Sequence, residues 1–102
     1  MKEVKAIIQP FMLQDVLEGL SKVDSLPAVT VSEVAGHSIV HPDYNAKPKS
    51  KLEIIVPDAM VDAVVDTIER CARTGKSGDG RIFVSNVVTT VKIRTGHREI
   101  AD

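Results

Sequence analysis

The apolar positions at the start of the chain follow two spacings, one typical of a strand and one typical of a helix. In residues 2–8, Val4, Ala6 and Ile8 alternate with other residues, which predicts a β-strand with one buried face. After Pro10, which favours a helix start, apolar residues recur every three or four positions. This helical stripe consists of Leu13, Val16, Leu17, Leu20 and Val23.

The middle of the chain predicts a strand, a loop, a third strand and a second helix. Residues 29–36 and 51–56 show the strand spacing. Residues 37–50 show neither spacing and contain two prolines, so we expect a loop there. Asp58 stands where its carboxylate would cap the second helix. The apolar stripe of that helix consists of Val61, Val64, Val65, Ile68 and Ala72.

Two further strands are predicted over 81–87 and 88–94, followed by a polar tail from Thr95 that we expect to be mobile in an isolated chain. The order strand, helix, strand, strand, helix, strand is that of the ferredoxin-like sandwich. We therefore predict an α+β fold with one extra carboxy-terminal strand, in a single domain over 1–102. Both helices would cover one face of the sheet. An uncovered apolar face favours self-association, so we expect an oligomer. The positions expected on that face include Ile7, Glu53, Ile55 and Phe83.

Composition removes several classes of protein. The chain has 102 residues and a net charge of −1, so no overall positive field draws it to nucleic acid. No apolar run approaches the roughly 20 residues that a membrane-spanning helix needs. Cys71 is the single cysteine and cannot form an intrachain disulfide, which is typical of the cytoplasm. Its place on the second helix predicts a half-buried structural thiol.

A glycine-rich segment from Arg73 to Val84 joins the second helix to the fourth strand. Its backbone N–H groups could form a concavity that holds an anion, and Lys76 and Arg81 could add charge-assisted hydrogen bonds. Phosphate is the anion we expect there. The same residues also fit a plain structural role, with Gly75 as the residue after the helix C-cap and residues 78–80 as a tight turn. Composition does not decide between these two interpretations.

Residues 74–84 (Thr-Gly-Lys-Ser-Gly-Asp-Gly-Arg-Ile-Phe-Val) resemble the nucleotide-binding loop of the P-II signal-transduction proteins. Residues 6–11, 30–36, 51–58 and 92–96 are also similar to segments of that family. The resemblance implies a homotrimer that binds ADP, AMP or ATP in clefts between subunits and has no permanently bound cofactor. It also implies a regulatory protein, not an enzyme, that controls a membrane transporter or a metabolic enzyme.

The resemblance divides the nucleotide site into two sides and names an effector loop at 37–50, a phosphate loop at 74–81 and a carboxy-terminal loop at 95–102. It implies that the adenine and ribose are lined by Ile7, Thr30, Gly36, Glu53 and Ile55, with His37 and Ser38 following at the loop base. It implies that the phosphates are held by Gly78, Asp79, Gly80 and Arg81, with Lys92 and Arg94 reaching in from the last strand.

The base of the effector loop departs from the family pattern. Residues 38–40 are Ser-Ile-Val where the family has Gly-Arg-Gln, and the loop is shorter. The missing Gln and Arg remove partners for Mg²⁺, 2-oxoglutarate and a third phosphate. We therefore expect ADP or AMP to bind at least as well as ATP, without coupling to 2-oxoglutarate. Bicarbonate is a candidate anion, which would suit inorganic-carbon signalling. Tyr44 does not stand in the family's modified motif.

Three other classes of protein are alternatives to this interpretation. A CutA-like trimeric metal-binding protein is the main alternative, although it would not explain the Gly-Asp-Gly sequence. An acylphosphatase-type enzyme is a further alternative, but it needs an Arg near the first strand, and residues 7–12 contain none. RNA-recognition modules stack bases on aromatic residues, which number only three here. His37, His41 and Asp43 could ligate a metal, but on a loop of unknown shape they do not make us expect a site.

Overall fold

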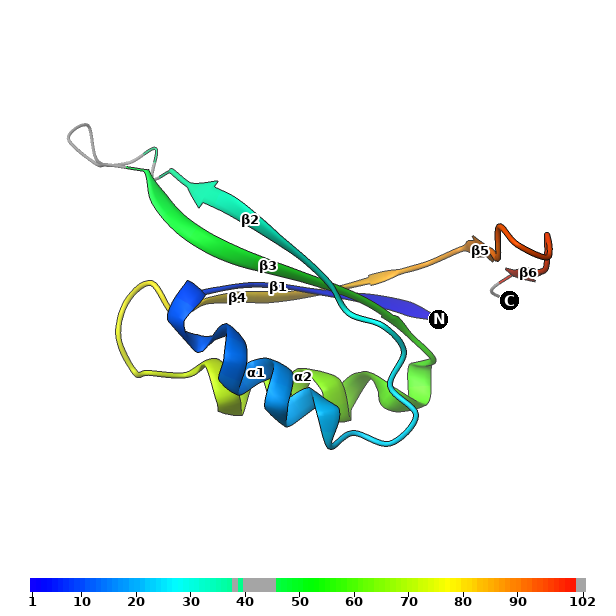
Figure 1. Cartoon of the computed structure of the whole chain (residues 1–102), viewed down its shortest axis with the longest axis horizontal. Helices are drawn as coiled ribbons and strands as arrows, with labels where there is room; N and C mark the ends of the chain where they lie inside the picture. The colour runs from blue at the N-terminus through cyan, green and yellow to red at the C-terminus, as the bar shows by residue number, and fades with distance from the viewer. Residues whose placement is uncertain (38, 40–45, 101–102) are drawn as a thin grey trace.

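A four-stranded antiparallel sheet, with both helices of the described part of the chain on one face, forms the body of the molecule (Figure 1). The computed structural model describes residues 1–37, 39 and 46–100. The elements are β1 (Lys2–Ile8), η1 (Pro10–Met12), α1 (Leu13–Ser21), β2 (Thr30–Gly36), β3 (Lys47–Val56), η2 (Asp58–Met60), α2 (Val61–Ala72), β4 (Gly80–Asn86), β5 (Thr89–Val91) and β6 (Arg98–Ile100). This order confirms the predicted ferredoxin-like α+β fold.

The strand order in the sheet is β2-β3-β1-β4, so β2 and β4 form its two edges. The β1–β3 pairing runs from Lys2 opposite Val56 to Ile8 opposite Ser50, and Ile8 also faces Gly80 on β4. One end of the sheet therefore gathers the end of β1 and the starts of β3 and β4. Strands β5 and β6 form a separate hairpin beyond the other end (Figure 1).

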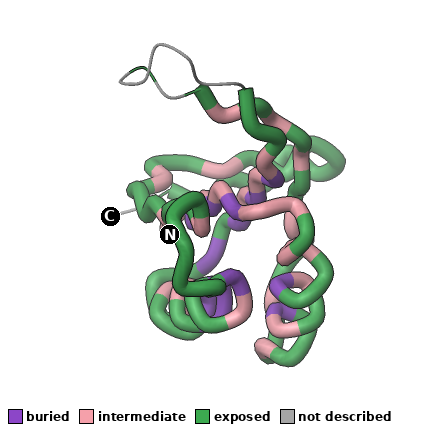
Figure 2. The backbone as a smooth tube through the Cα atoms, turned by 90° about the vertical axis from the view of Figure 1, so that its left-hand side faces the viewer, coloured by how far each residue is buried: buried purple, intermediate pink, exposed green. Residues whose placement is uncertain are grey.

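The core lies between the sheet and the helices (Figure 2). It combines the alternating strand positions and the two helical stripes, as the apolar spacing predicted. Burying one such side chain stabilises the fold by about 1.5–3 kcal/mol. Its fully or almost fully buried members are Val4, Ala6, Ile8, Val16, Leu20, Leu52, Ile54, Val56, Val64, Ile68 and Ala72.

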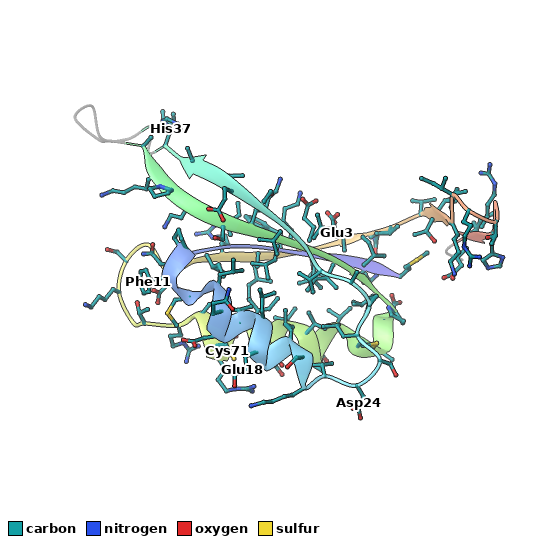
Figure 3. The ribbon with its side chains drawn as sticks, in the orientation of Figure 1. Glu3, Phe11, Glu18, Asp24, His37 and Cys71 are labelled. Atoms are coloured by element: carbon teal, nitrogen blue, oxygen red, sulfur yellow. The ribbon has the colours of Figure 1, made fainter. Side chains whose placement is uncertain are left out.

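The two helices approach each other closely at Gly19. A Cβ atom on Gly19 would lie 2.6 Å from the Cys71 Sγ atom of α2, so a larger residue would push the helices apart. Cys71 is half-buried, and Figure 3 labels it on α2. This position agrees with the structural role expected for its thiol.

The face of the sheet away from the helices carries the residues predicted there, in a mixture with charges. Phe83 and Ile55 are 47% and 37% exposed. Phe83 pairs with Lys5 and Lys5 with Glu53, so an aromatic ring, a cation and an anion follow one another across the sheet. Lys5 lies 3.7 Å from the Glu3 carboxylate, within ion-pair distance. The uncovered face is thus amphipathic, which is more polar than the apolar face we expected.

The predicted loop over 37–50 is too long, because β3 begins at Lys47 and not at residue 51. Residues 47–50 lack apolar alternation, but their backbone pairs with β2, from Gly36 opposite Lys47 to Glu33 opposite Ser50. β1 pairs with β3 only as far as Ser50, so Pro48 has no β1 partner and its missing N–H group is tolerated there. Backbone hydrogen bonds to β2 extend the strand here, and they leave no pattern in the side chains from which the strand could be predicted.

The carboxy-terminal prediction is also wrong in part. The last strand was expected over 88–94, but β5 ends at Val91 and the chain turns back. The backbone N–H of Gly96 donates a 2.7 Å hydrogen bond to the Lys92 carbonyl and closes this turn. β6 then pairs with β5, from Arg98 opposite Val91 to Ile100 opposite Thr89. The tail up to residue 100 therefore contains a strand, β6, that the sequence did not predict.

Both predicted helix boundaries of α2 need correction. The helix is preceded by the 3₁₀ turn η2, and Asp58 makes no side-chain capping bond. Its carboxylate instead lies 2.5 Å from the Met1 ammonium, and this contact holds the pKa of Asp58 below its ordinary value. At the other end the C-cap is Arg73, with an extended backbone. The chain has already left the helix two residues before Gly75, which is therefore not its C′ residue.

Candidate functional site

Asp79 holds the phosphate loop in shape. Its carboxylate accepts hydrogen bonds from the backbone N–H groups of Thr74 (2.8 Å) and Gly75 (2.9 Å), and also from the Thr74 hydroxyl. The Thr74 hydroxyl, followed by these backbone donors, holds the pKa of Asp79 below its ordinary value. The negative charge of the Asp79 carboxylate is thus used to hold the loop in its closed shape. Any contact of Asp79 with an anion would have to come from its backbone N–H.

Gly80 brings the phosphate loop directly onto the end of β1. Its φ is +100°, and a Cβ atom there would lie 1.7 Å from the Ile7 carbonyl oxygen. No side chain fits between these two backbones, so only glycine allows the approach. In the adjacent row Arg81 pairs with Ile7. The guanidinium of Arg81 makes no hydrogen bond or ion pair with another described residue, so it is available to a ligand.

Lys49 connects the start of β3 with the phosphate loop. Its Nζ atom donates a 2.7 Å hydrogen bond to the Gly78 carbonyl, and lies 3.5 Å from the Gln9 Oε1 atom. The stem of Lys49 passes close to Gly36, where a Cβ atom would lie 3.6 Å from Lys49 Cγ. Lys49 therefore lies against the phosphate loop and against the end of β2, where the effector loop begins. Lys49 was not among the residues predicted for the site, because residues 47–50 were expected to form part of a loop.

One signal in the sequence could have revealed Lys49. Lys47, Lys49 and Lys51 stand at alternate positions that continue the parity of Glu53 and Ile55. If the third strand had been extended backwards, all of these side chains would have been placed on one face. Lys51 lies 3.5 Å from the Glu53 carboxylate, so that cation is paired, whereas Lys49 takes part in no ion pair between described residues.

Most of the residues predicted for the nucleotide site fall at the two ends of the sheet, and Thr30 and Glu53 lie between these ends. The first end holds the phosphate loop and the end of β2, where Figure 3 labels His37. The second end leads into the β5–β6 hairpin, whose turn carries Lys92 and Arg94 (Figure 1). Six residue steps of β1 separate these ends, which is about 20 Å at roughly 3.4 Å per residue. One chain therefore does not bring the phosphate loop together with Lys92 and Arg94.

The individual predicted residues are distributed as follows. Thr30 and Glu53 pair with each other across β2 and β3, in the middle of the sheet, and Ile55 lies one row nearer the second end. Ser38 lies outside the described residues. The first end, named here the loop half, contains Ile7, Gly36, His37, Gly78, Asp79, Gly80 and Arg81. The remaining residues, named here the hairpin half, are Thr30, Glu53, Ile55, Lys92 and Arg94.

Two cavities accompany the two halves. A cavity of about 800 Å³ lies between the second end of the sheet and the β5–β6 hairpin, and its lining includes Ile55, Val91 and Lys92. A cavity of about 460 Å³ lies between α2 and β4, directly under the phosphate loop at Asp79 and Gly80. The larger cavity has a predominantly apolar lining in which Lys92 is accompanied by the paired Met1 ammonium and Asp58 and by Glu99, which suits a planar, partly apolar group better than a bare anion.

The described residues give no support to a metal centre. Within residues 1–37, 39 and 46–100, no three His, Cys, Asp or Glu side chains come together. His41 and Asp43 lie outside that part of the chain, as does Tyr44, so the possibilities raised for them remain expectations. In the same described part, neither helix has the length and apolar character needed to cross a bilayer.

The fold is thus a ferredoxin-like sandwich with a glycine-rich loop at one end of the sheet and a hairpin that carries Lys92 and Arg94 at the other. The family model described as "Nitrogen regulatory protein P-II" matches residues 1–97. "Nitrogen regulatory protein P-II 1" of Escherichia coli (strain K12) is 46% identical, covering 99% of this chain and 98% of its own. "Nitrogen regulatory protein P-II" of Klebsiella oxytoca is 45% identical with the same coverage. The protein of the same name from Bradyrhizobium diazoefficiens is 42% identical over 94% of each chain.

The chain therefore belongs to the nitrogen regulatory protein P-II family, as the resemblance of its segments predicted. Proteins of this family are regulators in signal transduction. They are characteristically trimers that bind adenine nucleotides and control target proteins.

Proposed function

We propose that this chain is an adenine-nucleotide sensor that binds ADP, AMP or ATP in clefts between the subunits of a homotrimer. The observation that carries the proposal is the separation of the phosphate loop, at one end of the sheet, from Lys92 and Arg94, beyond the other end. Residues about 20 Å apart along β1 cannot meet around one small molecule in one chain. In a ring of identical subunits, the loop half of one subunit faces the hairpin half of the next.

The two halves offer complementary chemistry. The loop half supplies backbone N–H groups and the free Arg81 guanidinium, which suit phosphates. The hairpin half supplies Ile55, the neighbouring apolar cavity and the cations Lys92 and Arg94, which suit an adenine ring and the phosphates approached from the other side. A single nucleotide that spans both halves would join two subunits.

The proposed role needs no chemical step, so the chain acts as a regulator and not as an enzyme. A nucleotide that prefers one conformation of the effector loop shifts the population towards it, and the difference in affinity sets the size of the shift. The target would be a membrane transporter or a metabolic enzyme in carbon or nitrogen signalling. Bicarbonate remains the candidate for a second, anionic ligand held by loop N–H groups.

Subunit mixing tests the shared site directly. Arg81→Ala damages the loop half, and the double variant Lys92→Ala/Arg94→Ala damages the hairpin half. Each variant alone should bind ADP at least about tenfold more weakly, since hydrogen bonds to charged groups are lost. When the two are unfolded and refolded together, about a quarter of the clefts should regain two intact halves by random assortment. Calorimetry should then detect a fraction of sites with the affinity of the unchanged protein.

The control is each variant refolded with itself, which should recover no tight sites. A mixture that recovers none, although light scattering shows mixed trimers, would mean that the site lies within one chain. Titrations of the unchanged protein with AMP, ADP and ATP, with and without Mg²⁺, 2-oxoglutarate and bicarbonate, identify the ligand. Absence of binding for all three nucleotides would refute the proposal.

A further inference from the structure

Lys49 is a cation whose present hydrogen-bond partners are neutral. Its Nζ atom donates to the Gly78 carbonyl at 2.7 Å and has the Gln9 amide oxygen at 3.5 Å. None of the ion pairs between described residues includes it. A hydrogen bond from an ammonium to an anionic oxygen is roughly twice as strong as a bond between neutral groups. An anion that reaches Gly78 would therefore compete successfully for this ammonium.

The setting of Lys49 favours such an exchange. Its ammonium lies on the phosphate loop, in which Arg81 is also free to meet an anion. The side chain is half-buried, so its charge is screened less than that of a fully exposed lysine. The next lysine along the face, Lys51, is already within ion-pair distance of Glu53. Of Lys49 and Lys51, Lys49 is therefore the one that has no carboxylate partner among the described residues.

We propose that Lys49 distinguishes nucleotides by their number of phosphates, exchanging the Gly78 carbonyl for an oxygen of an outer phosphate. The inference rests on the proposed function, because it needs a nucleotide in the cleft. AMP has no outer phosphate and leaves the Lys49–Gly78 hydrogen bond in place. ADP and ATP break this bond and gain a charge-assisted one. Because the stem of Lys49 also packs against Gly36, the exchange is felt at the end of β2, where the effector loop begins.

This assignment changes one expectation from the sequence. The Ser-Ile-Val base of the effector loop carries no cation, which made ADP or AMP seem at least as good a ligand as ATP. Lys49, on the neighbouring strand β3, nevertheless supplies a positive charge beside the phosphate loop. Nucleotides with outer phosphates should accordingly bind more tightly than AMP.

The decisive variant is Lys49→Met, which keeps an unbranched stem and removes the ammonium. Lys47→Met is the matched control, since Lys47 stands two residues earlier on the same face of β3 and is exposed. By calorimetry on the assembled protein, Lys49→Met should weaken ADP and ATP by about tenfold or more and change AMP by less than about twofold. Lys47→Met should leave all three affinities unchanged. Lys49→Arg should restore the preference for outer phosphates, because it restores the charge.

A merely structural role for Lys49 predicts a different result, namely an equal loss for AMP, ADP and ATP. That outcome, or no loss at all, would overturn the assignment while leaving the nucleotide-sensor proposal intact. If the unchanged protein binds no adenine nucleotide, both proposals fall together. Thermal unfolding checks that each variant is folded, and Lys49→Gln replaces Lys49→Met if the latter is not. The expected result is a loss confined to ligands with more than one phosphate.

Discussion

Replacing Gly80 by alanine should separate backbone strain from steric contact, because the phosphate loop contains its own control. Gly75 and Gly80 both have positive φ, at +85° and +100°. A Cβ atom on Gly75 meets nothing within 4 Å, whereas one on Gly80 meets the Ile7 carbonyl oxygen at 1.7 Å. Gly75→Ala thus reports the cost of the left-handed backbone alone. Gly80→Ala adds the collision with β1.

The two costs differ enough to measure. A non-glycine residue in the left-handed region costs about 1–2 kcal/mol, which is the loss expected for Gly75→Ala. A Cβ atom at 1.7 Å from an oxygen must be moved by more than an ångström to reach ordinary contact, about 3.3 Å or more. Because the clash is between the backbones of two strands, no side chain can move aside to relieve it, and β4 must separate from β1 around Ile8 and Gly80. Loss of at least one ladder hydrogen bond, about 1 kcal/mol, is added to the strain, so Gly80→Ala should lose roughly 3 kcal/mol or more.

Urea unfolding followed by far-ultraviolet circular dichroism measures both losses. All samples must have the same protein concentration, since the apparent stability of an oligomer depends on it. Nucleotide affinity should fall in Gly80→Ala even at low urea, because the substitution displaces the loop from Ile7. Equal losses in the two variants would refute the reasoning, as they would show that the close approach of Gly80 to Ile7 carries no energetic weight.

Three further predictions follow from the same loop and its surroundings. Arg81→Ala should weaken ADP binding by about tenfold or more without lowering the melting temperature, and an unchanged affinity in calorimetry would contradict the phosphate role. The pKa of Asp79 is lowered from its ordinary value of 3.8, so the ionised carboxylate stabilises the fold above that value, and this stabilisation is lost as the pH falls through the lowered pKa. Asp79→Asn should remove this part of the pH dependence of unfolding. An acid-unfolding profile identical to that of the unchanged protein would contradict this role of Asp79. ATP affinity with Mg²⁺ should not rise on adding 2-oxoglutarate, because residues 38–40 offer neither an amide nor a cation, and a tightening of about tenfold would show that other residues bind the oxoacid.

The fold was predictable wherever side-chain chemistry repeats along one element. The spacing of Val4, Ala6 and Ile8 identified β1 and its buried face, and the stripe containing Val64 and Ile68 identified α2. These patterns are set locally, since burial on one face of a strand or helix selects apolar residues at its own period. They also placed Ile55 and Phe83 correctly on the open face of the sheet.

The failures share another cause, which is that the deciding partner lies far away in the sequence. Residues 47–50 are a strand because β2 supplies a backbone ladder, and Asp58 is drawn to Met1, a residue 57 positions away. The site residues show the same limit. The resemblance named Arg81 and Lys92 as phosphate partners, but it could not indicate that they lie at opposite ends of the sheet of one chain. Lys49 was missed because its contact with Gly78 spans 29 positions.

The position of the two halves on different parts of the chain's surface has a consequence for assembly. Because the loop half and the hairpin half consist of different residues, a contact that joins the loop half of one subunit to the hairpin half of the next is head-to-tail and heterologous. Such a contact either closes into a ring or continues as a filament. A closed ring has as many complete sites as subunits, whereas an open chain always leaves one loop half and one hairpin half empty. A nucleotide that bridges the halves would therefore stabilise a closed ring relative to an open chain of subunits.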